Sequence, residues 1–151
     1  LLLLTVNSII IVNKSRDSGP IILANERSSL LSSQLAVIDY TYKESNLEKF
    51  NINAVTYPLY HNALWEYNYY WYGKKKYKFL PTWLGGDQLK LYKTLDKSQG
   101  NEKYTFMIID TTYRIPNKYQ EEGRKWGIEQ GKVLEETLIG GFIVQKIKNY
   151  D

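Results

Sequence analysis

The sequence contains no cysteine and only one histidine, His61, among its 151 residues. Without cysteine, the chain forms no disulfide, offers no thiolate to a metal ion and has no cysteine nucleophile. A single histidine does not build a histidine-based zinc site or a histidine pair. We therefore expect neither a bound metal ion nor a cofactor.

Motifs for nucleotide binding and for hydrolysis are missing as well. The chain has no phosphate loop and no dinucleotide-binding glycine pattern, and Gly85-Gly86-Asp87 indicates only a turn. No set of nucleophile, histidine and acid is recognisable. His61 is either a general base or, as is more common, a polar residue at the start of a helix, because catalytic residues normally occur as a constellation.

The composition indicates a single globular domain. Charged residues make up 24% of the chain and hydrophobic residues 43%, which suits a domain with a sizeable core and excludes a disordered chain. The net charge of +4 permits anionic partners such as phosphates or acidic lipids but does not require them.

The first twelve residues are mostly apolar, with Asn7 and Ser8 as interruptions. Twelve residues are too few to span about 30 Å of hydrocarbon. The basic residues Lys14 and Arg16 follow the apolar run, whereas in a signal peptide they precede it. Two interpretations remain open for residues 1–14: a strand or buried helix, or the end of a transmembrane helix. Residues 15–29 are predicted to be a linker, and 30–151 the folded domain.

Apolar periodicity and turn residues predict an alternation of helices and strands. Gly73 is expected to end the second helix, and Gly140-Gly141 to join the last two strands. The expected helices are 31–45, 59–72 and 116–130, and the expected strands are 50–57, 104–110, 133–138 and 142–147. This order predicts an α/β domain with a small mixed sheet of four to five strands and about three helices. Its first two main strands should be parallel, and a β-hairpin should close the chain.

Aromatic residues are concentrated between residues 57 and 77, which contain seven tyrosines and two tryptophans followed by Lys74, Lys75 and Lys76. One stripe of this segment fits helix packing: Tyr60, Leu64, Tyr67 and Trp71. The remaining rings need an interface or a second packing surface: Trp65, Tyr69, Tyr70 and Tyr72. Trp65 and Trp71 are therefore candidates for stacking on a substrate. The lysines indicate either contact with phosphates or a solvated helix end.

Asp110 follows the most apolar segment of the chain. Because ligands of open α/β sheets bind beyond the carboxyl ends of the strands, we expect Tyr57, His61, Asp110 and Arg114 to converge there as a weak substrate-binding site. The alternative is that Asp110 caps its own loop or pairs with Arg114.

Several segments resemble one region of a known family. These are 34–42 (QLAVIDYTY), 50–58 (FNINAVTYP), 69–77 (YYWYGKKKY) with Leu80-Pro81, Ile109-Asp110, 131–136 (GKVLEE) and 140–146 (GGFIVQK). They resemble the C-terminal extracytoplasmic domain of bacterial polytopic membrane glycosyltransferases related to the dolichyl-phosphate-mannose protein mannosyltransferases and the aminoarabinose transferase. The resemblance covers residues 30–148.

The resemblance implies an accessory domain that is not catalytic alone. Members of the family transfer a sugar from a polyprenyl-phosphate donor to an extracytoplasmic acceptor. Their catalytic acid lies in a loop between transmembrane helices, so no catalytic residue is carried over to this chain. The implied partners are the membrane domain of the same polypeptide and a polyprenyl-phosphate sugar donor or glycan acceptor, with no nucleic acid. The implied location is membrane-anchored, on the extracytoplasmic face.

Two other functions remain compatible with the sequence. One is a free-standing module that binds carbohydrate or peptide through the segment rich in tyrosine and tryptophan. The other is a small enzyme whose site is built from Asp110, Arg114 and His61.

Overall fold

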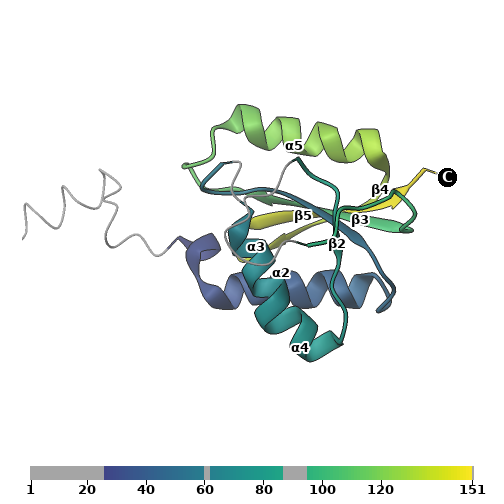
Figure 1. Ribbon diagram of the computed structural model, residues 1–151. Coiled ribbons are helices and arrows are strands. Elements are labelled where there is room, and N and C mark those ends of the chain that lie inside the picture. The colour runs from purple at the N-terminus through teal and green to yellow at the C-terminus, as the bar shows by residue number, and fades with distance from the viewer. Residues whose placement is uncertain (1–25, 60–61, 87–94, 151) are drawn as a thin grey trace, which may run out of the picture.

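The computed structural model of the chain describes residues 26–59, 62–86 and 95–150 (Figure 1). Within these ranges, one mixed five-stranded sheet lies between helices on its two faces. The α/β class, the mixed sheet and the C-terminal hairpin are thus as the sequence predicts. The apolar run at residues 1–14, most of the expected linker and His61 lie outside the described residues.

The strand order of the sheet is β2-β1-β3-β5-β4. The strands are β1 (Asn51–Val55), β2 (Thr82–Trp83), β3 (Tyr104–Asp110), β4 (Gly131–Ile139) and β5 (Phe142–Asn149). β1 pairs in parallel with β2 on one side and β3 on the other, and β3-β5 and β5-β4 are antiparallel. All seven residues of β3 are buried, which explains why its sequence is almost continuously apolar.

The hairpin between β4 and β5 follows from its two glycines. Gly140 and Gly141 have φ angles of 54° and 88°, in the left-handed region that residues with a β-carbon rarely adopt. A two-residue loop with both φ angles positive matches the right-handed twist of the flanking strands. The predicted join is therefore confirmed.

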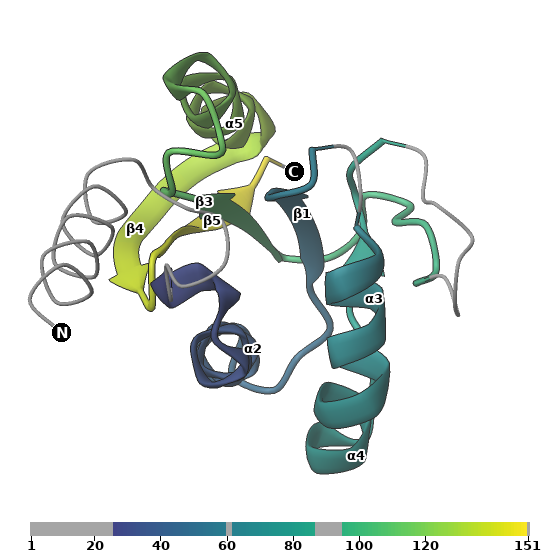
Figure 2. The ribbon, with the colours of Figure 1, turned by 90° about the vertical axis from the view of Figure 1, so that its left-hand side faces the viewer.

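Helices cover both faces of the sheet. They are the 3₁₀ turn η1 (Arg27–Ser29), α2 (Leu31–Glu44), α3 (Ala63–Asn68), the π-helical η2 (Tyr69–Gly73), α4 (Lys74–Tyr77) and α5 (Asn117–Gln130). α3, η2 and α4 follow one another as one continuous helix. Figures 1 and 2 show α2 and this long helix on one face and α5 on the other. None of the helices in the described ranges has the length and apolarity needed to cross a bilayer.

The prediction that Gly73 ends the second helix was wrong. Gly73 is buried with helical φ and ψ angles of −58° and −54°, and the helix continues to Tyr77. Lys78 takes the left-handed conformation instead, with φ 74°, and its N–H donates to the carbonyl of Lys74 at 3.0 Å. The ring of Tyr42 leaves little room for a side chain at position 73, because an added β-carbon would lie 3.0 Å from Cε2 of Tyr42.

The main core lies between the sheet and the two helices of the α2 face. Tyr42, Phe50, Trp65, Tyr69 and Phe106 are fully buried there. Phe50 makes edge contacts with the rings of Tyr42 and Phe106, at centroid distances of 5.2 and 5.3 Å. Much of the aromatic excess in the sequence therefore serves packing, in which edge-to-face rings are favoured.

The α5 face has a smaller core around Met107, Ile109 and Ile147. Gly123 and Gly127 let α5 approach the sheet closely, since a β-carbon at Gly127 would lie 2.3 Å from the side-chain oxygen of Gln145. Figure 2 shows α5 over β3, β4 and β5, with β1 to its side. Helix α5 therefore leaves part of the β1 side of this face uncovered.

Candidate functional site

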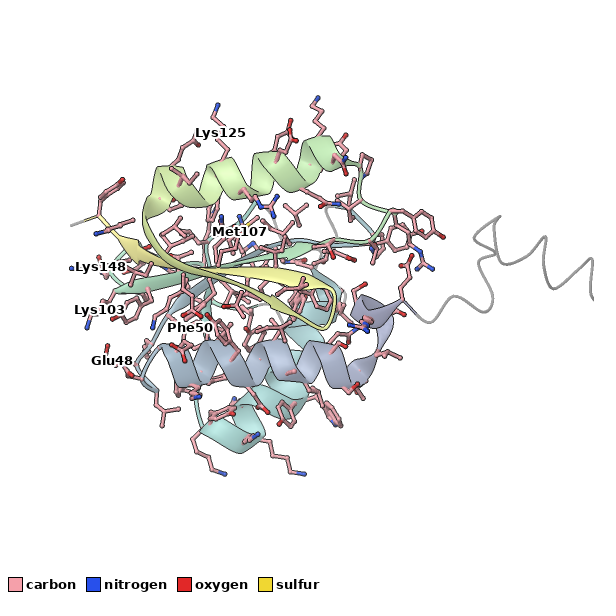
Figure 3. All side chains as sticks on the ribbon, turned by 180° about the vertical axis from the view of Figure 1, so that it is seen from behind. Glu48, Phe50, Lys103, Met107, Lys125 and Lys148 are labelled. Atoms are coloured by element: carbon pink, nitrogen blue, oxygen red, sulfur yellow. The ribbon has the colours of Figure 1, made fainter. Side chains whose placement is uncertain are left out.

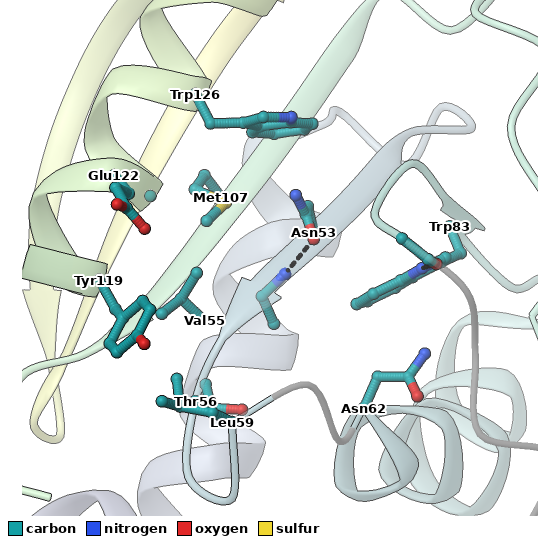
Figure 4. A pocket seen from close by; sticks show the side chains of 13 residues that line it. Asn53, Val55, Thr56, Leu59, Asn62, Trp83, Met107, Tyr119, Glu122 and Trp126 are labelled. Atoms are coloured by element: carbon teal, nitrogen blue, oxygen red, sulfur yellow. Dashed lines mark hydrogen bonds between the residues drawn. The ribbon is translucent and has the colours of Figure 1, made fainter. Parts of the chain in front are cut away.

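A cavity of about 430 Å³ opens between α5, the end of β1 and the segment from Trp83 to Gly86 (Figure 4). This volume falls within the range of roughly 300–1,000 Å³ that is usual for small-molecule sites. Three aromatic and three polar side chains give the cavity its character: Trp83, Tyr119, Trp126, Asn53, Asn62 and Glu122. We refer to it as the α5 cleft.

Strand β1 supplies the floor of the α5 cleft. Side chains of a strand alternate between its faces, so Asn53 and Val55 lie on the same face. The adjacent Asn51 is fixed by hydrogen bonds, because it accepts from the hydroxyl of Thr82 at 2.6 Å and donates to that of Thr105 at 3.3 Å. Polar side chains are tolerated here because they find partners or face the cleft.

Asn53 presents its amide to the α5 cleft. Its Oδ1 accepts from the backbone N–H of Ala54 at 2.8 Å, which fixes the orientation of the side chain. Figure 4 shows Asn53 between Trp126 and Trp83, with its amide nitrogen turned toward Trp126. Asn53 Nδ2 donates to no group in the described part of the chain. The α5 cleft therefore contains a hydrogen-bond donor, Asn53 Nδ2, whose orientation is fixed.

Trp83 forms a fixed aromatic wall. Its indole N–H donates to the carbonyl of Gly86 at 2.7 Å. Its backbone is held by Asp96 and Ser98, through N–H···O bonds of 2.8 and 2.9 Å. Gly85 packs against this ring so tightly that a β-carbon there would lie 2.6 Å from Cζ2 of Trp83. The position of the ring is thus set by the surrounding backbone.

Helix α5 supplies the opposite wall. Tyr119, Glu122 and Trp126 are spaced three and four residues apart, so they project from one side of the helix. Glu122 is the one charged side chain among the described lining residues, and it faces Lys118 at 3.8 Å. The α5 cleft therefore combines apolar ring surfaces with amide groups, and its described lining residues include no cation.

A second, smaller cavity of about 140 Å³ lies at the carboxyl ends of β1 and β3. Tyr57, Asp110 and Arg114 all line it, so three of the four residues expected to converge do so. The guanidinium carbon of Arg114 lies 5.4 Å from the centre of the Tyr57 ring, within the range of a cation–π contact. His61, the fourth, lies outside the described residues.

The charged side chains Asp110 and Arg114 that line the small cavity already have partners within the chain. Asp110 accepts from the backbone N–H of Thr112 at 2.9 Å, so it caps its own loop as the alternative interpretation holds. The ion pair of Arg114 is formed with Glu26, Nε to Oε2 at 3.3 Å, and the pairing with Asp110 that we considered is wrong. This cavity is therefore less suited to bind an anion than its arginine suggests.

The structure corrects the assignment of Trp65 to a binding surface. Trp65 is 0% exposed, packs edge-on against Phe142 at 5.3 Å and donates its indole N–H to Thr56 Oγ1 at 3.2 Å. Trp71, by contrast, is 47% exposed and stacks on Tyr67. The difference arises because the helix buries one side against the sheet and turns the other to solvent.

The three lysines after the aromatic segment are not equivalent. Lys76 forms a salt bridge of 2.9 Å with Asp39, so it already has an acidic partner, and its contact with phosphates stays a prediction. Burial raises the pKa of Asp39, but hydrogen bonds from Lys76, Tyr77 and Tyr72 outweigh burial and leave this pKa below its usual value. Lys74 and Lys75 are exposed.

The sequence analysis did not identify the residues of the α5 cleft as a site. Tyr119 and Trp126 lie in the expected helix 116–130, and Trp83 lies between the expected elements, where no site was predicted. The sequence does contain one signal for this site. Large rings at 119 and 126 lie on either side of Gly123, and Gly127 follows. A helix that packs on a sheet through its glycines directs such rings to the side of the contact.

The chain is a mixed α/β domain with an aromatic, amide-lined cleft. No protein-family model, no curated protein and no solved structure matches the chain. Within the described residues, no group of three or more potential ligands gathers to hold a metal ion.

Proposed function

We propose that this domain binds an uncharged carbohydrate in the α5 cleft. The observation that supports this most is the arrangement of three aromatic rings, Trp83, Tyr119 and Trp126, with two amide side chains around one cavity of about 430 Å³. A sugar ring has apolar C–H faces, which pack on aromatic rings, and hydroxyls, which pair with groups that both donate and accept. Amides of asparagine provide both functions.

The charge of the α5 cleft favours a neutral ligand. Its described lining contains the carboxylate of Glu122 and no lysine or arginine. A phosphate group would meet no cationic partner among the described lining residues, and phosphate recognition normally relies on arginine, lysine or clustered backbone N–H groups. Within the family that the sequence resembles, this favours a glycan acceptor over the phosphate of a polyprenyl donor.

The proposed setting is an accessory, extracytoplasmic domain of a membrane glycosyltransferase. In this setting the α5 cleft holds the acceptor glycan, while the chemistry takes place in the membrane domain of the same polypeptide. The coding sequence before Leu1 tests the setting separately from the cleft. A series of hydrophobic spans upstream supports it, and a start codon directly before Leu1 contradicts it.

Binding is tested on the 151-residue chain with an array of neutral and anionic oligosaccharides, followed by titration calorimetry with the strongest neutral ligand. We expect Trp126→Ala to weaken affinity by about tenfold or more, which corresponds to about 1.4 kcal/mol of lost ring contact. Trp71→Ala removes an equally large ring outside the cleft and is the matched control. Binding only to anionic glycans or only to peptides, or equal losses in both variants, would contradict the proposal.

A further inference from the structure

One surface of the long helix has a composition unlike the rest of the molecule. It consists of Tyr67, Trp71, Lys74, Lys75 and Lys78, all of them exposed. We call it the aromatic–lysine surface. Figures 1 and 2 show that α4, which carries two of these lysines, projects from the domain on the side opposite α5. The surface is therefore convex and accessible.

The two rings of this surface are left in contact with water. Tyr67 and Trp71 are 46% and 47% exposed, and they stack on each other with centroids 6.2 Å apart and ring planes 9° from parallel. Such rings combine an apolar body with a polar tip, which is the reason that tyrosine and tryptophan accumulate at the headgroup level of membranes. The core does not need them, because Trp65 and Tyr69 fill that role.

The three lysines of this surface differ from the neighbouring Lys76 in their ion pairing. In the described ranges no carboxylate lies within salt-bridge distance of Lys74, Lys75 or Lys78, although the neighbouring Lys76 is paired with Asp39. The ammonium group of Lys78 instead donates to the carbonyl of Lys75 at 3.0 Å. Three positive charges that no described carboxylate pairs with thus lie within one or two helical turns of the exposed rings.

We propose that the aromatic–lysine surface docks the domain onto an anionic phospholipid bilayer. The rings of Tyr67 and Trp71 enter the headgroup region, and the lysines contact lipid phosphates. A lipid surface fits better than a nucleic acid, because single-stranded nucleic acids are bound in basic grooves that follow the backbone, whereas this surface is the projecting end of a helix. The positive charge complements an anionic leaflet.

The docking surface and the α5 cleft lie on opposite faces of the sheet. A domain that rests on lipid through the end of α4 would hold the α5 cleft away from the bilayer, open to a ligand. The docking proposal does not depend on the identity of that ligand, and the two sites are tested with separate variants.

The test measures co-flotation of the 151-residue chain with vesicles of phosphatidylcholine alone or with about 30% phosphatidylglycerol. We expect stronger binding to the anionic vesicles, which falls as salt is added. Lys74→Gln with Lys75→Gln should weaken this binding by about 25-fold, since each lysine near an anionic surface contributes about fivefold.

The matched control is Lys118→Gln with Lys125→Gln on α5, which causes the same change in net charge at two exposed lysines on the opposite face. It should change binding by no more than about twofold. Trp71→Ala should also weaken vesicle binding, whereas Trp126→Ala should leave it unchanged. Circular dichroism confirms that each variant is folded.

Three outcomes would overturn the docking proposal: no binding to anionic vesicles, equal binding to neutral and anionic vesicles, or equal effects of the two lysine pairs. The last would assign membrane binding to another part of the chain, such as the apolar residues 1–12. Retained vesicle binding in Trp126→Ala, combined with lost glycan binding, would show that the two sites act separately.

Discussion

Gly73 lies directly against the ring of Tyr42, so that an added β-carbon would stand 3.0 Å from both Cε2 and the hydroxyl oxygen of that tyrosine. Tyr42 is fully buried, and its hydroxyl donates to the carbonyl of Phe79 at 2.6 Å. Its ring also stacks on Tyr77 at 4.2 Å. These contacts restrict any movement of Tyr42 that would make room for a side chain at position 73.

Gly73→Ala is expected to destabilise the protein, although alanine favours a helix over glycine by about 1 kcal/mol. The clash with Tyr42 should outweigh this gain and leave a net loss of about 1–2 kcal/mol in the free energy of unfolding. Urea denaturation measures the difference. Gly86→Ala, which meets no atom within 4 Å, is the control. A more stable Gly73→Ala variant would contradict the packing argument.

Gly85→Ala is expected to impair the α5 cleft. Its β-carbon would lie 2.2 Å from Oδ1 of Asn53 and 2.6 Å from Cζ2 of Trp83, so both walls must shift. We expect a loss of about 1–3 kcal/mol in stability and a clear loss of glycan affinity. Calorimetric titration measures the affinity, with Trp71→Ala, which lies outside the cleft, as the control. Unchanged affinity in a folded Gly85→Ala variant would show that these positions do not govern binding.

Glu66 should make stability fall with rising pH. Burial raises the pKa of this carboxyl group, and a hydrogen bond with Asn62 offsets the rise only in part. The folded state then holds a proton that the unfolded state releases near its usual pKa of about 4.3, so stability decreases from that pH up to the raised pKa. Glu66→Gln should melt at a higher temperature than the parent chain near neutral pH, and the difference should vanish in acid.

The exposed Glu121→Gln is the control for this substitution. It should leave the melting temperature unchanged across the same pH range. A Glu66→Gln variant that is less stable than the parent at neutral pH would mean that the charged carboxylate has a favourable partner.

Asp39, in contrast to Glu66, should make stability fall as the pH is lowered. Its lowered pKa means that its contribution to stability is present above the unfolded pKa of about 3.9 and is lost as the pH falls through the folded value. Because the side chains of Asp39 and Lys76 are partly exposed, we expect Asp39→Asn to cost only about 0.5–1 kcal/mol near neutral pH. Adding Lys76→Gln should cost little more, and additive losses in this double-mutant cycle would contradict a direct coupling.

Several elements could be predicted because their signals are local. The apolar run of β3 and the apolar periodicity of α2 indicate directly which of their residues are buried. Helix α2 ends within one residue of its expected limit. The hairpin turn favours glycine at both positions because both φ angles are positive. The parallel order of β1 and β3 brought Tyr57, Asp110 and Arg114 together as expected, because carboxyl ends of parallel strands meet at one edge.

Other features depended on partners that the local sequence does not reveal. Strand β2 has only two residues, and its conformation comes from pairing with β1 rather than from its own propensity. Whether Trp65 or Trp71 faces solvent depends on how the long helix rotates against the sheet. Tyr67 and Trp71, which belong to the expected packing stripe, are exposed, whereas Trp65 and Tyr69 are buried, so that part of the prediction was wrong. The described lining of the α5 cleft takes only Leu59 and Asn62 from the aromatic-rich segment, and neither is aromatic.

The amino-acid sequence alone determined the α/β class, the limits of α2, α5 and β3 to within one residue, the closing hairpin and the freedom from cysteine chemistry. Periodicity, turn residues and composition act over short stretches of chain, and they can be read without coordinates. Only the tertiary structure decided that Gly73 serves packing, that Lys76 is paired and that Trp83 and Trp126 face one cleft. Each of these depends on contacts between residues distant along the chain, and such contacts form only when the helices settle on the sheet.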